Sequence, residues 1–187
     1  MLADVSGKGI PAALLSSLAL GALNMEYGSS ADPAAVLTNV NKLLCRKSPR
    51  NRFVTLLLAQ FDRQGRGCFI SAGHSTAFIF RADSERLESV GSTGMPLGMF
   101  PFSTYEASAL ELRPGDTLAI YSDGLTDAEN PAGEEFGEDR LRELLQLTAP
   151  AGAAAIESAL LAALDEFTKG AAQTDDITLV LVQRHRV

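Results

Sequence analysis

The middle of the chain constrains the fold most, because residues 53–122 form a series of short apolar runs separated by turn residues. The runs are Phe53 to Phe61, Cys68 to Ala72, Ala77 to Phe80, Arg86 to Val90, Tyr105 to Leu112 and Asp116 to Tyr121. A glycine-bearing turn, Arg63 to Gly67, separates the first two runs and predicts a hairpin. The pattern predicts an antiparallel meander rather than strands that alternate with helices.

Helical periodicity flanks this region on both sides. The expected helices are Ile10 to Met25, a segment that opens at Asp32-Pro33, a segment around Leu141 to Leu145, and Ala151 to Lys169. Asp32 suits an N-cap and Pro33 the first helical position, while Gly170 suits the position after a helix end. Ile177 to Val182 is apolar throughout, which predicts a central strand. We therefore expect an α+β protein whose helices pack on a sheet.

The size and charge of the chain exclude several classes of protein. Its 187 residues fit one domain, residues 1–187. No apolar run reaches the roughly 18 residues that span a bilayer, and there is no signal-peptide pattern, so we expect no membrane partner. Cys45 and Cys68 predict two free thiols in a reducing cytoplasm, which favours a cytoplasmic protein. The net charge of −7 argues against a nucleic-acid partner.

Three aspartates stand in similar settings and carry the candidate chemistry. Asp123 follows an apolar run and precedes a glycine, Asp4 precedes the first helix, and Asp175 precedes the last strand. Carboxylates within about 4 Å of one another repel by about 4 kcal/mol per pair, so three of them stay ionised together only around a cation. Oxygen ligands without histidine or cysteine suit Mg²⁺ or Mn²⁺ rather than zinc. We hypothesise that the three aspartates converge on metal ions that hydrolyse a phosphate ester.

Other interpretations of these residues stay open. An aspartate beside a glycine is first of all a turn signal, so each of the three could be a loop residue. A calcium loop starting at Asp123 fails, because Ala128 occupies the position that requires glycine. His74 fits a structural hydrogen-bonding role at a strand end. With His74 and His185 as the only histidines, a Ser-His-Asp triad has little support.

Five segments, in this order, resemble the motifs of one family. They are Asp4 to Ala13, Ser71 to His74, Gly94 to Gly98, Tyr121 to Ala128, and Asp175 to Thr178. In type, order and separation they are similar to the bacterial SpoIIE/RsbU metal-dependent protein phosphatases of the PPM (protein phosphatase 2C-like) superfamily. The resemblance covers essentially the whole chain.

The resemblance implies a fold, a site and a substrate class. The fold would be a four-layer αββα sandwich of two antiparallel sheets flanked by helices. Asp4 would bridge two Mn²⁺ or Mg²⁺ ions, the carbonyl of Val5 would help to hold one, and Asp123 and Asp175 would complete the other site. A metal-activated water would then hydrolyse phosphoserine or phosphothreonine on a protein. The usual substrate is a phosphorylated STAS anti-anti-sigma factor in bacterial partner switching.

The chain departs from the family pattern at its start. The family has further strands before the Asp4 motif, and an aspartate there ligates the second metal, whereas this chain begins three residues before Asp4. The resemblance thus implies a domain without its first strands, with two metal ions or only one. Unpaired sheet edges would favour a homodimer or a partner that supplies the missing strands. The alternative function is a non-catalytic (pseudophosphatase) interaction module.

Overall fold

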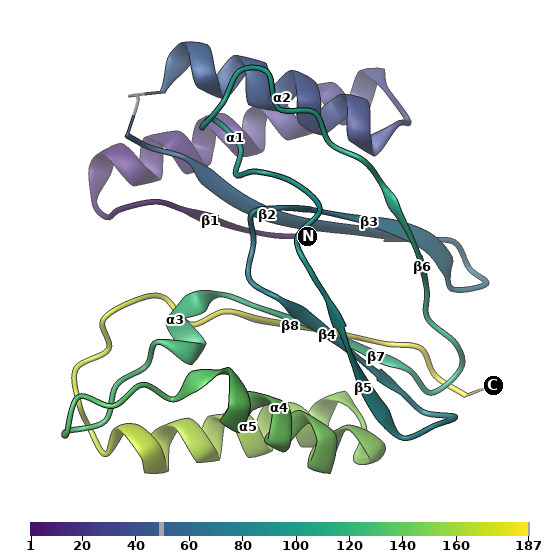
Figure 1. Cartoon of the computed structure of the whole chain (residues 1–187), viewed down its shortest axis with the longest axis vertical. Coiled ribbons are helices and arrows are strands. Elements are labelled where there is room, and N and C mark those ends of the chain that lie inside the picture. Colours follow the sequence, from purple (N-terminus) through teal and green to yellow (C-terminus); the bar gives the residue numbers. More distant parts are fainter. Residues whose placement is uncertain (49–50, 187) are drawn as a thin grey trace. The chain divides into compact units, whose positions relative to one another are not determined.

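The structure is a computed structural model that describes residues 1–48 and 51–186. It divides the chain into two compact units. Unit 1 comprises Met1–His74 and Gly91–Glu111, and unit 2 comprises Ser75–Val90 and Leu112–Val187. Each unit contains one four-stranded antiparallel sheet and its own helices (Figure 1). The prediction of an α+β fold with two antiparallel sheets and flanking helices is confirmed.

The sheet of unit 1 has the strand order β1-β2-β3-β6. The elements of this unit are β1 (Leu2–Val5), α1 (Ile10–Ser29), α2 (Pro33–Lys47), β2 (Val54–Phe61), β3 (Arg66–Ala72) and β6 (Ser108–Glu111). The predicted hairpin is present, because β2 pairs with β3 as far as Phe61 opposite Gly67. The predicted N-cap is also present: the Ala34 N–H donates to Asp32 Oδ1 at 3.0 Å. The run from Tyr105 to Leu112 is strand only at Ser108–Glu111.

Helices α1 and α2 pack against one face of this sheet. Leu23 of α1 and Leu37 of α2 share a buried apolar cluster with Leu56 of β2 and Ile70 of β3. Every second side chain of these strand segments lies on the face that the helices cover, because the same cluster contains Val54, Leu56 and Leu58 of β2 and Ile70 and Ala72 of β3. Strand β1 was not expected from the sequence. It pairs antiparallel with β2, with Asp4 opposite Thr55, so the site motif starts within the sheet.

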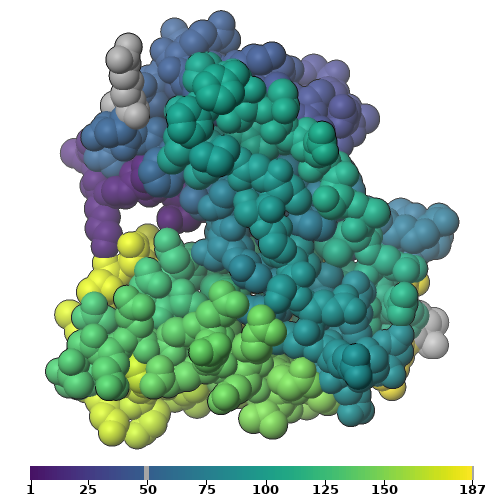
Figure 2. Space-filling model, in the orientation of Figure 1, coloured from purple at the N-terminus to yellow at the C-terminus, as the bar shows by residue number. Residues whose placement is uncertain are grey.

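The sheet of unit 2 has the strand order β5-β4-β7-β8. The elements of this unit are β4 (Ala77–Arg81), β5 (Arg86–Val90), β7 (Thr117–Tyr121), α3 (Asp123–Thr126), α4 (Gly137–Thr148), a 3₁₀ turn η1 (Ala149–Ala151), α5 (Ala153–Thr168) and β8 (Leu179–Gln183). Helix α5 ends at Lys169 in the left-handed conformation, and Gly170 follows as expected. Helices α4 and α5 form much of the green surface of this unit in Figure 2.

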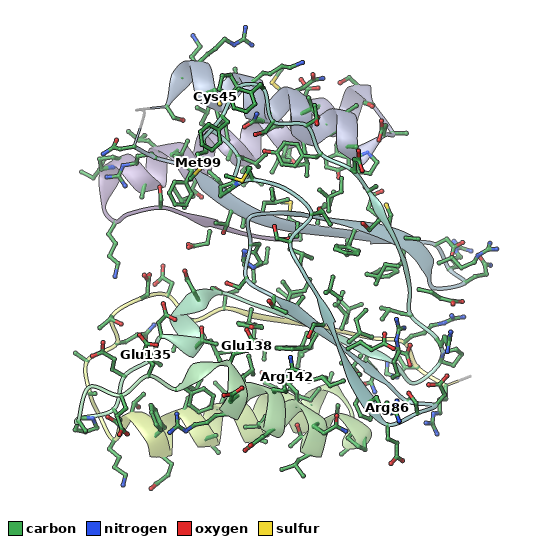
Figure 3. The ribbon with its side chains drawn as sticks, viewed as in Figure 1. Cys45, Arg86, Met99, Glu135, Glu138 and Arg142 are labelled. Carbon is green, nitrogen blue, oxygen red and sulfur yellow. The ribbon has the colours of Figure 1, made fainter. Side chains whose placement is uncertain are left out.

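The core of unit 2 lies between its sheet and helices α4 and α5. Phe78 and Tyr121 stack in this core with ring centroids 6.0 Å apart. Arg142 extends from α4 toward the sheet, where its guanidinium lies 5.0 Å from the centroid of the Phe78 ring (Figure 3). The side chain thus covers an aromatic face while its charge stays at the rim of the core.

Strand β8 corrects one prediction from the sequence. In the described part of the chain it pairs only with β7, so it is an edge strand of its sheet and not a central one. The apolar side chains of Leu179 and Leu181 pack against the buried cluster under the helices. The prediction was wrong because an apolar sequence shows only that the side chains of a strand are buried. It does not show how many other strands pair with that strand. None of the described helices is both long and apolar enough to cross a membrane.

Candidate functional site

Asp123 stands where the buried strand β7 gives way to solvent. All five residues of β7 are buried, Ser122 is buried after them, and the Asp123 side chain is exposed. The predicted turn is in fact one turn of helix, α3, in which the Asp127 N–H donates to the Asp123 carbonyl at 2.8 Å. The strand therefore delivers a carboxylate to the surface at a fixed point of the backbone.

Hydrogen bonds from Ser122 join the start of this turn to the segment that carries Asp175. Its Oγ donates to the Asp176 carbonyl at 2.9 Å and accepts from the Thr178 N–H at 2.9 Å. Its own N–H donates to the Thr178 carbonyl at 3.0 Å. Three hydrogen bonds thus join two segments that lie more than 50 residues apart. The sequence pattern had assigned Ser122 no role. A small hydroxyl residue between a buried strand and Asp-Gly was the feature that could have indicated this positioning role.

Gly124 shows how closely the two segments approach. A Cβ added at this glycine would lie 2.4 Å from the Asp176 carbonyl oxygen and 3.2 Å from the Asp175 Cβ. The first distance is too short for any real contact, so a residue with a side chain would push the segments apart. Unit 2 therefore brings the backbones of Asp123 and Asp175 together. The Asp175 side chain, like that of Asp123, is exposed.

Asp4 and Val5 lie at the end of β1 in unit 1, and both are partly buried. The next residue, Ser6, accepts two hydrogen bonds, one at its side chain and one at its backbone carbonyl. Ser6 Oγ accepts from the Phe53 N–H at 2.8 Å, and Arg52 Nη1 donates to the Ser6 carbonyl at 2.7 Å. The backbone that presents Asp4 and the Val5 carbonyl is thus anchored to the start of β2.

His74 behaves as the sequence suggested. It is buried, and its Nδ1 lies 3.1 Å from Thr55 Oγ1, with which it shares a hydrogen bond. Thr55 stands opposite Asp4 in the β1–β2 pairing. This contact between two parts of unit 1 supports a structural role for His74.

The candidate donors suit a hard divalent cation, since all are oxygens: three carboxylates and one backbone carbonyl. Unit 2 supplies Asp123 and Asp175, and unit 1 supplies Asp4 and Val5. Among the described residues, no group of three or more histidine, cysteine, aspartate or glutamate side chains is placed to hold a metal ion. The assignment of these four residues as metal ligands therefore stays a prediction.

Comparison with known proteins places these residues in a family context. The family model of Stage II sporulation protein E (SpoIIE) matches residues 1–185. The chain is 36% identical over 137 residues to Protein IcfG of Synechocystis sp., and 29% identical over 133 residues to Phosphoserine phosphatase RsbU of Bacillus subtilis. Each match covers 71% of this chain, but 21% of IcfG and 40% of RsbU. The chain thus spans less than half the length of these relatives.

Solved structures share the architecture. The SiaA-PP2C domain of Pseudomonas aeruginosa superposes with a TM-score of 0.82 at 25% sequence identity, over 97% of this chain and 72% of that one. The PP2C-like fold that the motifs implied is therefore confirmed. A shared fold does not by itself assign an activity, so the function has to be argued from the site.

Proposed function

Since the chain belongs to the SpoIIE family of PPM-type phosphatase domains, we propose that it hydrolyses phosphoserine or phosphothreonine on a protein substrate. The junction of Ser122 with Asp176 and Thr178 carries the proposal. Three hydrogen bonds and a glycine contact hold two candidate ligand segments together. Asp123 and Asp175 are exposed there, and a purely structural junction has no need of two exposed carboxylates at this point.

The proposed metal ligands are Asp4, the carbonyl of Val5, Asp123 and Asp175. Carboxylate and carbonyl oxygens favour Mn²⁺ or Mg²⁺, and carboxylates that share one site stay ionised together only around a cation. When bound, such ions supply Lewis-acid polarisation of a phosphate ester and lower the pKa of water. The family resemblance implies two such ions, or one.

The chain's own residues have positioning roles in this proposal. Ser122 and Gly124 fix where Asp175 stands relative to Asp123 within unit 2. Arg52 and Ser6 fix the backbone that presents Asp4 and Val5 within unit 1. Such fixed geometry matters because a misplacement of about 1 Å can lower a rate by about 100-fold.

The proposed substrate is a phosphorylated STAS-domain protein in partner-switching regulation. Two matched relatives of Bacillus subtilis, RsbU and RsbP, carry the name phosphoserine phosphatase. This name supports phosphoserine as the substrate group. The STAS partner follows from the resemblance of the five motifs and extends the proposal beyond that name.

Hydrolysis of p-nitrophenyl phosphate and of a phosphorylated STAS protein, with and without Mn²⁺, tests the activity. We expect Mn²⁺-dependent turnover that Asp123→Asn abolishes, because the amide removes a charged ligand. Asp127→Asn is the matched control, since it removes the same charge from an exposed aspartate four residues on. Equal activity of the wild type and Asp123→Asn would overturn the proposed role of Asp123.

A non-catalytic interaction module is the second candidate. One observation bears on it: within either unit taken by itself, the described residues include no group of three histidine, cysteine, aspartate or glutamate side chains placed to hold a metal ion. Absence of turnover with Mn²⁺, even after a family-type N-terminal segment is added, together with retained binding of the STAS protein, would establish this alternative.

The edge strands of the two sheets bear on whether the protein forms oligomers. Among the described residues, β1 pairs only with β2, and β8 pairs only with β7. Such edges can accept a further strand, so we propose a homodimer or a strand-donating partner. Light scattering at micromolar concentration tests the dimer, and a monomeric mass would contradict it.

A further inference from the structure

A groove of about 800 Å³ lies between helices α4 and α5 of unit 2. Figure 1 shows these two helices side by side on one face of the unit 2 sheet. The α4 wall extends from Arg140 to Thr148, roughly 12 Å or about two helical turns. The α5 wall begins at Ala163, and a loop before α4 adds to the lining. Neither Asp123 nor Asp175 lines the groove, so it is separate from the candidate metal ligands of this unit.

Apolar side chains make up most of the lining of this groove. The larger ones and the alanine between them are Pro131, Phe136, Leu144, Leu147, Ala163 and Phe167. Leu147 is 80% exposed, and Leu144 and Phe167 are only partly buried. Phe136 and Phe167 meet edge to face with ring centroids 5.4 Å apart, which fixes the aromatic part of the wall. An occupant that covers these side chains removes apolar surface from water, which favours an apolar occupant.

The uncharged polar side chains of the lining are already hydrogen-bonded within the chain. Thr148 Oγ1 donates to the Leu144 carbonyl at 2.7 Å. Asn130 Nδ2 donates to Glu134 Oε2 at 2.9 Å, and Asn130 Oδ1 accepts from the Ala132 N–H at 2.9 Å. Both long walls are helices, whose backbone groups bond within the helix and offer no edge to an extended strand. The groove therefore recognises side chains, and an occupant that is itself a helix needs no backbone partner there.

The two basic side chains of the lining are held by the protein itself. The Arg140 guanidinium lies 4.8 Å from the centroid of the Phe167 ring. Arg140 Nη1 also donates to two backbone carbonyls of the preceding residues, at 2.9 and 2.8 Å. Lys169 lies 3.6 Å from a carboxylate oxygen of Glu166. These two basic groups therefore form part of the wall.

Carboxylates outnumber these two basic groups around the groove. Glu143 lines the groove and forms neither a hydrogen bond nor an ion pair within the described part of the chain. Glu134 and Glu135 are exposed in the loop that contributes to the lining. Residues 127–139 contain six aspartates and glutamates and no lysine or arginine. With Glu166 included, four carboxylates face two cations, so the rim favours a positively charged partner.

We propose that this groove binds an amphipathic helix of a partner protein, with an apolar stripe flanked by lysine or arginine. Apolar residues at i, i+3 or i+4, and i+7 of such a helix span two turns, which matches the length of the groove. The stripe packs against Leu144, Leu147 and Phe167, and the basic flank faces Glu143 and the acidic loop. This interaction goes beyond the proposed phosphatase function and does not depend on it.

Amide chemical-shift perturbation on the full chain tests the proposal with three synthetic peptides of about 16 residues. The first carries a helical leucine stripe flanked by lysines, and the second has glutamates in place of the lysines. The third is a scrambled version of the first without the stripe. We expect saturable shifts at residues 140–148 and 163–169 with the first peptide and none with the third. The second should bind at least about tenfold more weakly, because its charges oppose those of the rim.

Three results of this experiment would overturn the proposal. The first is an absence of saturable shifts at residues 140–148 and 163–169, and the second is equal binding of the lysine and glutamate peptides. The third is saturation of the groove by indole, a small apolar probe, without any binding of the lysine peptide. That last result would assign the groove to a small apolar ligand.

Two exposed leucines provide a matched pair of variants. Leu147→Lys places a charge in the groove and should weaken the lysine peptide by about tenfold or more, since an apolar contact is lost. Leu161→Lys adds the same charge at an exposed leucine of α5 that does not line the groove, and it should bind as the wild type does. Equal weakening by the two variants would contradict binding in the groove.

A charge reversal tests the basic flank of the partner. Glu143→Lys should weaken the lysine peptide and strengthen the glutamate peptide, each by about fivefold. Glu157→Lys reverses an exposed charge of α5 outside the groove and should change either affinity by less than about twofold. Unchanged affinities of both peptides for Glu143→Lys would overturn the proposed complementarity of charge.

Discussion

Ser122 Oγ donates a hydrogen bond of 2.9 Å to the carbonyl oxygen of Asp176. This bond joins the end of β7 to the segment before β8 at the level of the two candidate carboxylates of unit 2. The same oxygen accepts from the Thr178 N–H, so the hydroxyl is used in both directions. Asp123 and Asp175 therefore depend on one buried hydroxyl for their relative placement.

Replacing this hydroxyl should cost both stability and activity. Ser122→Ala leaves the Asp176 carbonyl and the Thr178 N–H without their partner, which should lower the free energy of unfolding by about 1–3 kcal/mol. If the proposed phosphatase function holds, kcat should fall by roughly 10- to 100-fold as the Asp175 segment shifts. Urea denaturation and Mn²⁺-dependent turnover measure the two effects.

Ser16→Ala is the control, since Ser16 is exposed on α1. Its effect on the free energy of unfolding should stay within about 0.5 kcal/mol. A Ser122→Ala protein with unchanged stability and turnover would show that the junction does not depend on this hydroxyl.

Two glycines that both lie in helices should respond in opposite directions to alanine. In Gly124→Ala the new Cβ meets the Asp176 carbonyl oxygen, so we expect a loss of about 1–3 kcal/mol in the free energy of unfolding. In Gly21→Ala the Cβ meets nothing within 4 Å, so better helix propensity should add about 0.5–1 kcal/mol. The midpoints of urea denaturation give the signs, and a stabilising Gly124→Ala would contradict the close approach.

Local features of the fold could be predicted from the sequence because their causes are local. The β2–β3 hairpin followed from two apolar runs around one turn. The cap on α2 followed from Asp32-Pro33, and the end of α5 from Gly170. In each case the residues that decide the structure lie within a few positions of it.

The features that were missed depend on residues far away in the chain. Strand β1 exists because β2, some 50 residues later, supplies its hydrogen bonds, and four residues are too few to show a period. The edge position of β8 depends on pairing partners that composition does not report. Similarly, the motifs indicated Asp123 and Asp175, but the bond from Ser122 that joins their segments spans 54 positions.

Asp116 should be a stability residue of unit 2. It is 1% exposed and accepts from Arg81 Nη1 at 2.9 Å and from the Ala82 and Arg113 N–H groups at 3.0 Å each. Asp116→Asn removes the buried partner of Arg81, which then keeps its ion pair with the half-exposed Glu88. We expect the free energy of unfolding to fall by roughly 1.5–3 kcal/mol, the range for hydrogen bonds to charged groups.

Asp83→Asn is the matched control, because its pair with Arg113 is exposed on both sides and should change stability little. Chemical denaturation measures both variants. Equal small effects would show that the buried pair of Asp116 with Arg81 is not needed for the fold.

The three tyrosines of the chain should make its stability fall at high pH. Burial raises the pKa of Tyr27, Tyr105 and Tyr121 above the ordinary value of about 10. A raised pKa means that the folded state keeps protons that the unfolded state loses. The contribution of the protonated tyrosines to the free energy of unfolding is therefore fully present below a pH of about 10. It is lost as the pH rises through the pKa values that the tyrosines have in the folded state. Tyr105 and Tyr121 can each lower the free energy of unfolding by up to about 1.4 kcal/mol for every pH unit in this range.

Near-ultraviolet titration of tyrosinate, with circular dichroism recorded in parallel, measures this effect. In the folded protein the tyrosinate signal should lag behind that of the urea-unfolded chain and rise together with alkaline unfolding. Tyr105→Phe removes one of the three groups along with a hydrogen bond of 3.0 Å to the Met95 carbonyl. It should lower stability at neutral pH and flatten its decline above pH of about 10, because one fewer proton is released on unfolding. Half-ionised tyrosines at that pH in a fully folded protein would contradict the raised pKa values.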